Sequence, residues 1–388
     1  MTSINSIELR KFVAPEFVFG TDARFLAGRY AKNLGARKVL VVTDPGVIRA
    51  GWTAQVISSL EKENLPYSVF SSISSNPRAQ EVMEGAELYR QEGCNVIVAT
   101  GGGSPMDCAK GIGIVDSNGS SILEFEGVDQ VPIPGPPLIC IPTTAGSSAD
   151  VSQFAIINNS EKQVKIAIVS KTVVPDAALI DPVTTLSMDV HLTACTGMDA
   201  LTHAIEAYVS DASSPITDLH ALEAVRLVSS SLLALLSDTG NVALRSNMML
   251  ASLHAGLAFS NASLGAVHAM AHALGGLLDL AHGHCNSILL PHVMDYNFDA
   301  VAGRYYSVGD AMGLRLEGMT SDQKKKAVLG EVKRLQHEAG VDQSLSQIGA
   351  SRSDISQLAQ NAMLDACMVT NPRKPGQKDI EAIYEKAF

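Results

Sequence analysis

Strand-forming and helix-forming segments alternate along the first half of this 388-residue chain, and the alternation then stops. Short β-branched runs are followed by longer segments with helical period, and the last strand signal comes before Asp181-Pro182. Such alternation predicts a parallel sheet that helices cover on both faces. The predicted strands are residues 38–43, 67–70, 95–99 and 137–141, and the predicted helices are residues 51–63 and 79–92.

The second half is almost wholly helical in period from about Thr185 onward. Breaks in the helical pattern are predicted at residues 213–215 and 238–240, at Gly283 and at Pro291. A chain of this length exceeds the usual span of one hydrophobic core. We therefore predict an α/β domain at residues 1–185 and an all-helical domain at residues 186–388.

Net charge, cysteine usage and hydropathy indicate which partners this protein binds and in which cellular compartment it works. The net charge of −11 argues against binding to nucleic-acid phosphates. The six cysteines show no CxxC and no paired spacing, which is typical of a reduced cytosolic protein. Residues 1–11 show no secretory signal, and the apolar stretch at 248–281 contains histidines that would be costly in lipid. We expect a cytoplasmic protein that binds neither membranes nor nucleic acid.

A glycine-rich loop follows the predicted strand at residues 95–99. Gly101-Gly-Gly-Ser104 leads into Pro105, which suits the first turn of a helix. Glycines let a backbone approach a ligand closely, and the N–H groups at a helix start hold anions such as pyrophosphate. The spacing is not GxGxxG, so this motif alone leaves a flexible loop as the alternative.

Two further polar positions follow strands of the predicted sheet. Asp44 comes directly after the strand at 38–43, where a carboxylate can bind a ribose 2′-OH and repel a 2′-phosphate. An alternative role for Asp44, equally compatible with the sequence, is to cap the N-terminus of the next helix. Pro142-Thr-Thr-Ala-Gly-Ser-Ser148 ends the strand at 137–141. Ligands of open α/β sheets bind at the carboxyl ends of strands, so this loop and the glycine loop at 101–104 are expected to line one crevice.

The helical half places a carboxylate and several histidines four residues apart, with a further pair at a predicted helix end. Residues four apart lie on one face of a helix and can point into the same cleft. One carboxylate with several imidazoles suits a divalent cation such as Fe(II), Zn(II), Ni(II) or Mn(II). A hydrogen-bonded pair on a helix surface is the alternative for the first pair. The residues are Asp199, His203, His268, His272, His282 and His284.

Taken together, these segments resemble the iron-containing (group III) alcohol dehydrogenase family. The matching blocks lie at 101–110, 142–148, 197–207, 282–286 and 370–373. They occur in the family's order and spacing from about residue 12 to Phe388. The resemblance implies the fold that the family shares with dehydroquinate synthase, in which an α/β dinucleotide-binding domain and an all-α domain enclose a metal.

The resemblance also implies site residues in the helical half. The metal ligands would be Asp199, His203, His268 and His282, with Fe(II) as the expected metal. His272 matches a histidine often given a proton-relay role, so it is the predicted catalytic residue. Phe259 falls where family members line the substrate pocket, although plain core packing is the alternative. His284 lies outside the ligand pattern.

On the cofactor side the resemblance implies NAD, with NADP less expected because Asp44 matches a position associated with NAD preference. The loop that ends in Ser148-Ala-Asp150 departs from the family pattern, in which a small residue and Ser precede Glu. This departure leaves the nicotinamide and substrate contacts open. The predicted cofactor-binding residues are Asp44, Asn76, Gly102, Gly103, Ser104, Asp107, Thr143, Thr144, Ser147 and Lys165.

The expected activity is hydride transfer between NAD and a small primary alcohol or diol. The metal polarises the substrate oxygen, and the nicotinamide accepts or delivers the hydride. Two alternatives stay open, a lyase of the dehydroquinate synthase type and a non-catalytic regulatory homologue. The apolar residues around the histidines favour a small alcohol or aldehyde over the charged substrate of such a lyase. The family resemblance also suggests a homodimer or larger homo-oligomer.

Overall fold

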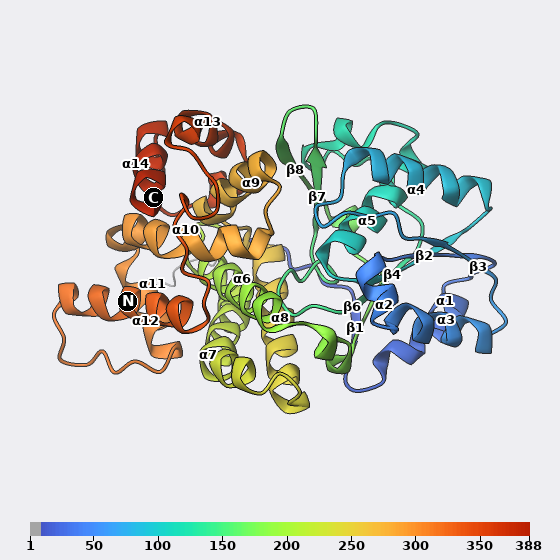
Figure 1. The fold of residues 1–388 in the computed structure, drawn as a ribbon, viewed down its shortest axis with the longest axis horizontal. Helices are drawn as coiled ribbons and strands as arrows, with labels where there is room; N and C mark the ends of the chain where they lie inside the picture. The colour runs from blue at the N-terminus through green and yellow to red at the C-terminus, as the bar shows by residue number, and fades with distance from the viewer. Residues whose placement is uncertain (1–8) are drawn as a thin grey trace.

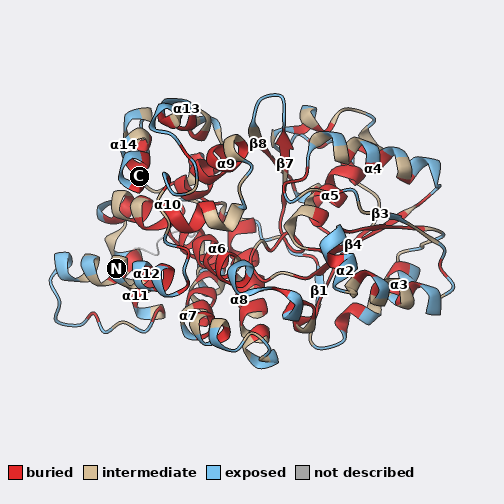
Figure 2. Ribbon diagram, in the orientation of Figure 1, coloured by how far each residue is buried: buried red, intermediate tan, exposed pale blue. Residues whose placement is uncertain are grey.

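The computed structural model describes residues 9–388 as an α/β part beside a helical part (Figure 1). Residues 1–8, where the sequence shows no secretory signal, lie outside the described residues. Buried residues concentrate in the sheet of the first part and in the central helices of the second (Figure 2). The expected combination of a parallel α/β part and a helical part is confirmed.

Within residues 9–388, six parallel strands form the main sheet in the order β1-β9-β6-β4-β2-β3. The four strands predicted from the sequence correspond to β2, β3, β4 and β6. All residues of β2, β4, β6 and β9 are buried, as expected for parallel strands covered on both faces. The strands are β1 (Glu16–Phe19), β2 (Val39–Val42), β3 (Tyr67–Phe70), β4 (Val96–Gly101), β6 (Leu138–Pro142) and β9 (Ala177–Ile180).

Helices cover both faces of this sheet because successive strand residues point in opposite directions. Leu40 and Val42 of β2 pack in a core with α4 and α5, whereas Val39 and Val41 pack in a core with α1 and α3. From β2 the chain adds β3 on one side and then β4 on the other, so the strand order reverses between β2 and β4. In open α/β sheets such a reversal places a ligand crevice at the carboxyl ends of the two strands. The helices are α1 (Ala27–Asn33), α2 (Pro45–Arg49), α3 (Trp52–Lys62), α4 (Ala79–Gln91) and α5 (Gly103–Asn118).

A second, smaller sheet was not expected from the sequence. It consists of β5 (Gly127–Val128), β8 (Val164–Val169) and β7 (Phe154–Asn159), with β7 and β8 paired antiparallel. The sheet packs on α5 through β7 and on α9 of the helical part through β8. A Cβ atom added to Gly276 of α9 would lie 2.7 Å from Val164 Cα, so the two parts touch there through backbone.

The helical part is built around α6 (Val190–Val209), which packs against α7, α8 and α10. β9 ends at Ile180 and α6 begins at Val190, so the predicted domain boundary near residue 185 falls in their connection and stays a prediction. The other helices are α7 (Pro215–Ser237), α8 (Val242–Ala262), α9 (Ala266–Leu278), α10 (His282–Asn297), α11 (Ala302–Ala311), α12 (Ser321–Glu338), α13 (Ile355–Leu364) and α14 (Gln377–Ala387).

Among the described residues, α7 is the one helix long and apolar enough to cross a membrane by length and composition. It packs on α6 and α8 and buries Val225, Val228 and Leu232 in their core. Core helices of soluble proteins also meet this criterion of length and composition, so α7 by itself is weak evidence for a membrane-spanning segment. The apolar stretch at 248–281 forms parts of α8 and α9 instead. All six cysteines are buried and free in the described structure.

The break predicted at Gly283 lies slightly earlier, between the end of α9 at Leu278 and the start of α10 at His282, and the break predicted at Pro291 is wrong, because Pro291 lies inside α10. Gly283 is needed for close packing, since a Cβ atom there would lie 2.6 Å from the Cys195 carbonyl oxygen of α6. Pro291 cannot donate to the carbonyl of Ser287 four residues earlier. The side chain of Gln336 donates a hydrogen bond to that carbonyl and allows the helix to continue.

Candidate active site

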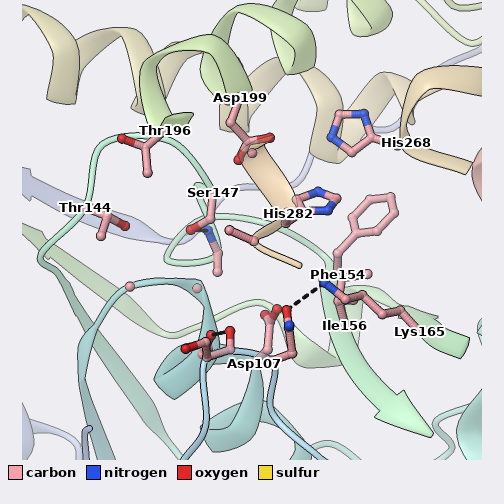
Figure 3. Close-up of a pocket in the computed structure, with 18 of the residues that line it drawn as sticks. Asp107, Thr144, Ser147, Phe154, Ile156, Lys165, Thr196, Asp199, His268 and His282 are labelled. Atoms are coloured by element: carbon pink, nitrogen blue, oxygen red, sulfur yellow. Dashed lines mark hydrogen bonds between the residues drawn. The ribbon is translucent and has the colours of Figure 1, made fainter. Parts of the chain in front are cut away.

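A cavity of about 360 Å³ lies between the α/β part and the helical part. Figure 3 shows Asp107 on the side of the glycine loop, with Asp199, His268 and His282 across from it. The cavity brings together all the predicted metal ligands, the predicted catalytic residue, the predicted substrate-pocket residue and most predicted cofactor residues. Those residues are Asn76, Gly102, Gly103, Ser104, Asp107, Thr144, Ser147, Lys165, Asp199, His203, Phe259, His268, His272 and His282.

The four predicted ligands come from three helices that meet at one point. Asp199 and His203 are one turn apart on α6, as expected from their spacing. His268 lies in the first turn of α9, and His282 is the first residue of α10. One donor atom from each of the four side chains lies within 4.8 Å of all the others. This spacing is compact enough for one ion to contact the whole set.

The histidines of this group are neutral in their buried setting. Burial lowers the pKa of His203 to about 4 and that of His268 to about 3. Burial, together with the neighbouring histidines, also holds the pKa of His282 well below its ordinary value. A metal binds the neutral imidazole, so no proton has to be displaced from these rings near pH 7.

Asn286 shows that three of the acceptor atoms point to one region. Its Nδ2 lies 2.7 Å from Asp199 Oδ1, 3.0 Å from His268 Nε2 and 3.1 Å from His282 Nε2. Neither Asn286 Oδ1 nor His282 Nδ1 finds a hydrogen-bond partner among residues 9–388. A carboxylate and three neutral imidazoles with converging lone pairs fit a divalent transition metal.

His272, the predicted catalytic residue, lies one turn after His268 and beside the ligand group. Its ring stacks on His282 with ring centroids 5.1 Å apart. Its Nδ1 lies 2.8 Å from Asp365 Oδ2, and Asp365 Oδ1 accepts the N–H of Cys367. Burial opposes ionisation of Asp365, but the neighbouring His272 lowers the pKa of this carboxyl. The ring of His272 is therefore held by a carboxylate.

The glycine loop and the polar loop at 142–148 lie against one another, as predicted. Gly102 precedes α5 and Gly103 is its first residue, so the N–H groups of the helix start face the cavity. A Cβ atom on Gly102 would lie 3.2 Å from the Thr144 side chain, and one on Gly103 would lie 3.1 Å from Ser147. Glycine at these two positions therefore allows the two loops to pack closely along the cavity.

Three polar side chains extend this surface, of which Asn76 and Lys165 are buried and Asp107 is half-buried. Asp107 accepts the N–H of Ile156, and burial raises its pKa to about 6. Lys165 Nζ donates to Asn76 Oδ1 at 2.7 Å, and Asn76 Nδ2 donates to Asp279 Oδ1 at 2.8 Å. Asn76 thus links the α/β part to the loop that precedes His282.

Two predicted cofactor residues lie outside the cavity lining. Asp44 caps α2, and its Oδ1 accepts the N–H groups of Gly46 and Val47. The capping alternative is therefore present, and the expected ribose contact stays a prediction. Thr143 is buried behind the loop, where its N–H donates to the Gly101 carbonyl.

The unusual end of the polar loop packs on the helical part. Ser148 adopts a φ of 51°, and its hydroxyl donates to the Ser252 carbonyl of α8 at 2.6 Å. A Cβ atom on Gly256 would lie 2.5 Å from Ser148 Cβ. Asp150 is also buried, which raises its pKa to about 6. The departure from the family pattern thus lies where the loop contacts α8.

One wall of the cavity is apolar. Phe259 stacks on His203 with ring centroids 4.3 Å apart, and Phe154 meets Phe259 edge to face at 5.5 Å. Leu264 also lines this wall. Cys367 is buried, and its backbone N–H donates a hydrogen bond to Asp365 Oδ1. Phe259 is therefore a cavity residue as well as a packing residue.

Several residues of the site could not be singled out from the sequence. Glu206 shares the face of α6 with His203, and Asn286 lies one turn after His282, so helical spacing was the available signal. Asp365 and Phe154 carry no local signal, because their roles depend on segments distant in the chain.

Both halves of the chain match known protein-family patterns. Residues 14–182 match the family described as iron-containing alcohol dehydrogenase, and residues 193–388 match the C-terminal part of the Fe-containing alcohol dehydrogenase family. The chain belongs to the iron-containing alcohol dehydrogenase family. As a member of this family it is an oxidoreductase that interconverts alcohols and aldehydes.

Individual relatives agree with this assignment. The chain is 38% identical to a 1,3-propanediol dehydrogenase of Citrobacter freundii over 372 residues, which cover 95% of this chain and 96% of the relative. It is 39% identical to alcohol dehydrogenase 4 of Schizosaccharomyces pombe, over 100% of this chain and 91% of the relative. A solved 1,3-propanediol oxidoreductase superposes with a TM-score of 0.95 at 36% identity, covering 98% of this chain and 100% of that structure.

Proposed function

We propose that this alcohol dehydrogenase transfers hydride between NAD and a small primary alcohol or diol, with a divalent metal held by Asp199, His203, His268 and His282. Fe(II) is the expected metal, and Zn(II), Ni(II) or Mn(II) would also suit this donor set. One observation supports the proposal above the others. Four neutral or anionic donor atoms within 4.8 Å of one another line the same cavity as the glycine loop.

In the proposed reaction, a bound metal would polarise the substrate oxygen, and a bound nicotinamide would accept or deliver the hydride. The start of α5 at Gly102 and Gly103 would hold the pyrophosphate by backbone N–H groups. Phe259 and Phe154 would exclude water from the reacting carbon. His272 would pass the proton of the alcohol toward solvent while Asp365 holds its ring in place.

The cavity supports a small substrate rather than a large or highly charged one. It has to contain part of the cofactor within about 360 Å³. Among its described lining residues, Lys165 is the only Lys or Arg, and it is hydrogen-bonded to Asn76. A dehydroquinate synthase-type substrate, with a carboxylate and a phosphate, would need more cations. The relatives named above are dehydrogenases, which also disfavours a non-catalytic role.

The direct test measures NADH formation with a series of short alcohols and diols, together with the metal content of the purified protein. We expect turnover with NAD, loss of turnover after treatment with a strong chelator, and recovery when Fe(II) or another divalent metal is added. No turnover with any alcohol, when metal is measured at one equivalent, would contradict the proposal.

A separate prediction concerns Asp44. Asp44→Ser keeps an oxygen that can cap α2 but removes the charge that would repel a 2′-phosphate. We expect the ratio of kcat/KM for NAD over NADP to fall by at least about tenfold, since the lost repulsion is worth on the order of 1.4 kcal/mol. Steady-state kinetics with both cofactors measure the ratio. An unchanged ratio would leave Asp44 with the capping role alone.

The family resemblance also leads us to propose a homodimer or larger homo-oligomer in the cytoplasm, with domains at 1–185 and 186–388. Sedimentation analysis of the purified enzyme measures the oligomeric state, and a monomer at micromolar concentration would contradict it.

A further inference from the structure

A buried carboxylate behind the proposed metal ligands has no role in the reaction described above. Glu206 lies on α6 three residues after His203 and seven after Asp199, so all three share one face of the helix. The residue is only 4% exposed. A carboxylate is costly to bury and is expected to have several hydrogen-bond donors around it.

The donors around Glu206 come from the first turn of α9. Oε1 accepts the N–H of Val267 at 2.7 Å, and Oε2 accepts the N–H of His268 at 3.3 Å. Oε2 also lies 2.6 Å from Nδ1 of His268. Gly265, which precedes α9, has no side chain to cap the helix, and a Cβ atom there would lie 2.8 Å from Oε1. Glu206 therefore caps α9 from another helix and holds the ring of His268 at the same time.

These contacts fix which nitrogen of His268 carries the proton. Nδ1 faces a carboxylate that accepts hydrogen bonds, so Nδ1 is the donor. Nε2 faces the amide nitrogen of Asn286, which donates to it at 3.0 Å and also donates to Asp199. Both neighbours select the neutral ring with the lone pair on Nε2, on the side of Asp199 and His282. His282 has no such support, since its Nδ1 finds no partner among the described residues.

We propose that Glu206 is a positioning residue for the metal, which acts by holding the ring of His268 in the orientation and tautomer that a metal ligand needs. The proposal rests on the ligand set given under Proposed function. Carboxylates that accept the second N–H of a ligating histidine typically change metal affinity by 10- to 100-fold when they are removed.

The test compares metal affinity in Glu206→Gln with that of the native enzyme, using Co(II) or Zn(II) in competition with a chelator. Gln is close in shape but has no charge and only one acceptor oxygen, so it cannot accept from Val267 N–H and hold His268 Nδ1 at the same time. We expect the dissociation constant for the metal to rise 10- to 100-fold. In ¹⁵N spectra of the metal-free form, where Nε2 is not coordinated, we expect the proton of His268 to shift away from Nδ1.

Asn371→Ala is the matched control, because Asn371 also caps α9 but does not touch His268. Its Oδ1 accepts the N–H of Ala266 at 3.1 Å. We expect this variant to unfold at a lower temperature and to bind metal as tightly as the native enzyme. A dissociation constant for Glu206→Gln within about threefold of the native value would overturn the proposal. An equal loss of affinity in Asn371→Ala would also overturn it, because helix docking would then explain both variants.

His268→Ala separates this proposal from the one on which it rests. If His268→Ala binds metal more weakly and Glu206→Gln does not, only the role of Glu206 fails. If His268→Ala binds metal normally, the ligand set itself is wrong, and the role of Glu206 falls with it.

Discussion

Asp199→Ala is expected to abolish both metal binding and alcohol oxidation. Asp199 is the one carboxylate among the four converging donors, so the variant would leave a dication with neutral imidazoles in a buried site. Metal polarisation of the substrate oxygen contributes several kcal/mol, which corresponds to a loss of at least about 10³-fold in kcat/KM. Elemental analysis after gel filtration and NADH formation measure the two effects.

His284→Ala is the control for this experiment. His284 lies only two residues after His282, but its Nε2 is hydrogen-bonded to Gln343 at 2.7 Å and its ring meets His191. We expect this variant to keep its metal and its activity. If Asp199→Ala retains one equivalent of metal, or if His284→Ala loses it, the assignment of ligands has to be revised.

Gly146→Ala is expected to lower kcat by about 100-fold while the metal stays bound. Gly146 lies in the polar loop at 142–148, and a Cβ atom there would lie 2.6 Å from the Thr196 carbonyl oxygen of α6. Backbone cannot yield to this contact, so the loop must move away from the helix that carries Asp199. A displacement approaching 1 Å between reacting groups is enough for a loss of this size.

Gly303→Ala provides the comparison, because Gly303 lies in α11 at an exposed position with open space where its Cβ would be. Alanine is favoured over glycine inside a helix, so this variant should be active and slightly more stable. Kinetics, metal content and thermal unfolding of both variants are the required measurements. A native kcat in Gly146→Ala would show that the spacing between the loop and α6 does not limit the reaction.

The parts that could be predicted from the sequence are those that depend on local periodicity. The β-branched run at 39–42 forms a strand in almost any α/β protein, and the four-residue step from Asp199 to His203 defines one helix face without knowledge of the fold. The position of Asp199 beside His268 could not be predicted in this way, since it depends on how α6 and α9 both pack against α10. The resemblance to a known family supplied that information.

The errors and omissions have a common physical cause. Pro291 was predicted to break a helix, but Gln336, 45 positions further along the chain, compensates for the missing hydrogen bond. Glu206 resembles an ordinary helix-surface residue until the first turn of α9 is placed against it. Asp365 becomes relevant only through its contact with His272, 93 positions earlier. In each case the partner lies far away in sequence, where local patterns carry no information.

The glycine contacts between the two parts of the molecule restrict how the cavity can open. Gly146 meets Thr196, Gly256 meets Ser148, and Gly276 meets the backbone of β8, each at a distance that excludes a methyl group. Because none of these contacts leaves room for a methyl group, they set the distance between the polar loop and β8 on one side and α6, α8 and α9 on the other. The four converging donors of the helical part are therefore held at a fixed distance from the cofactor side of the cavity.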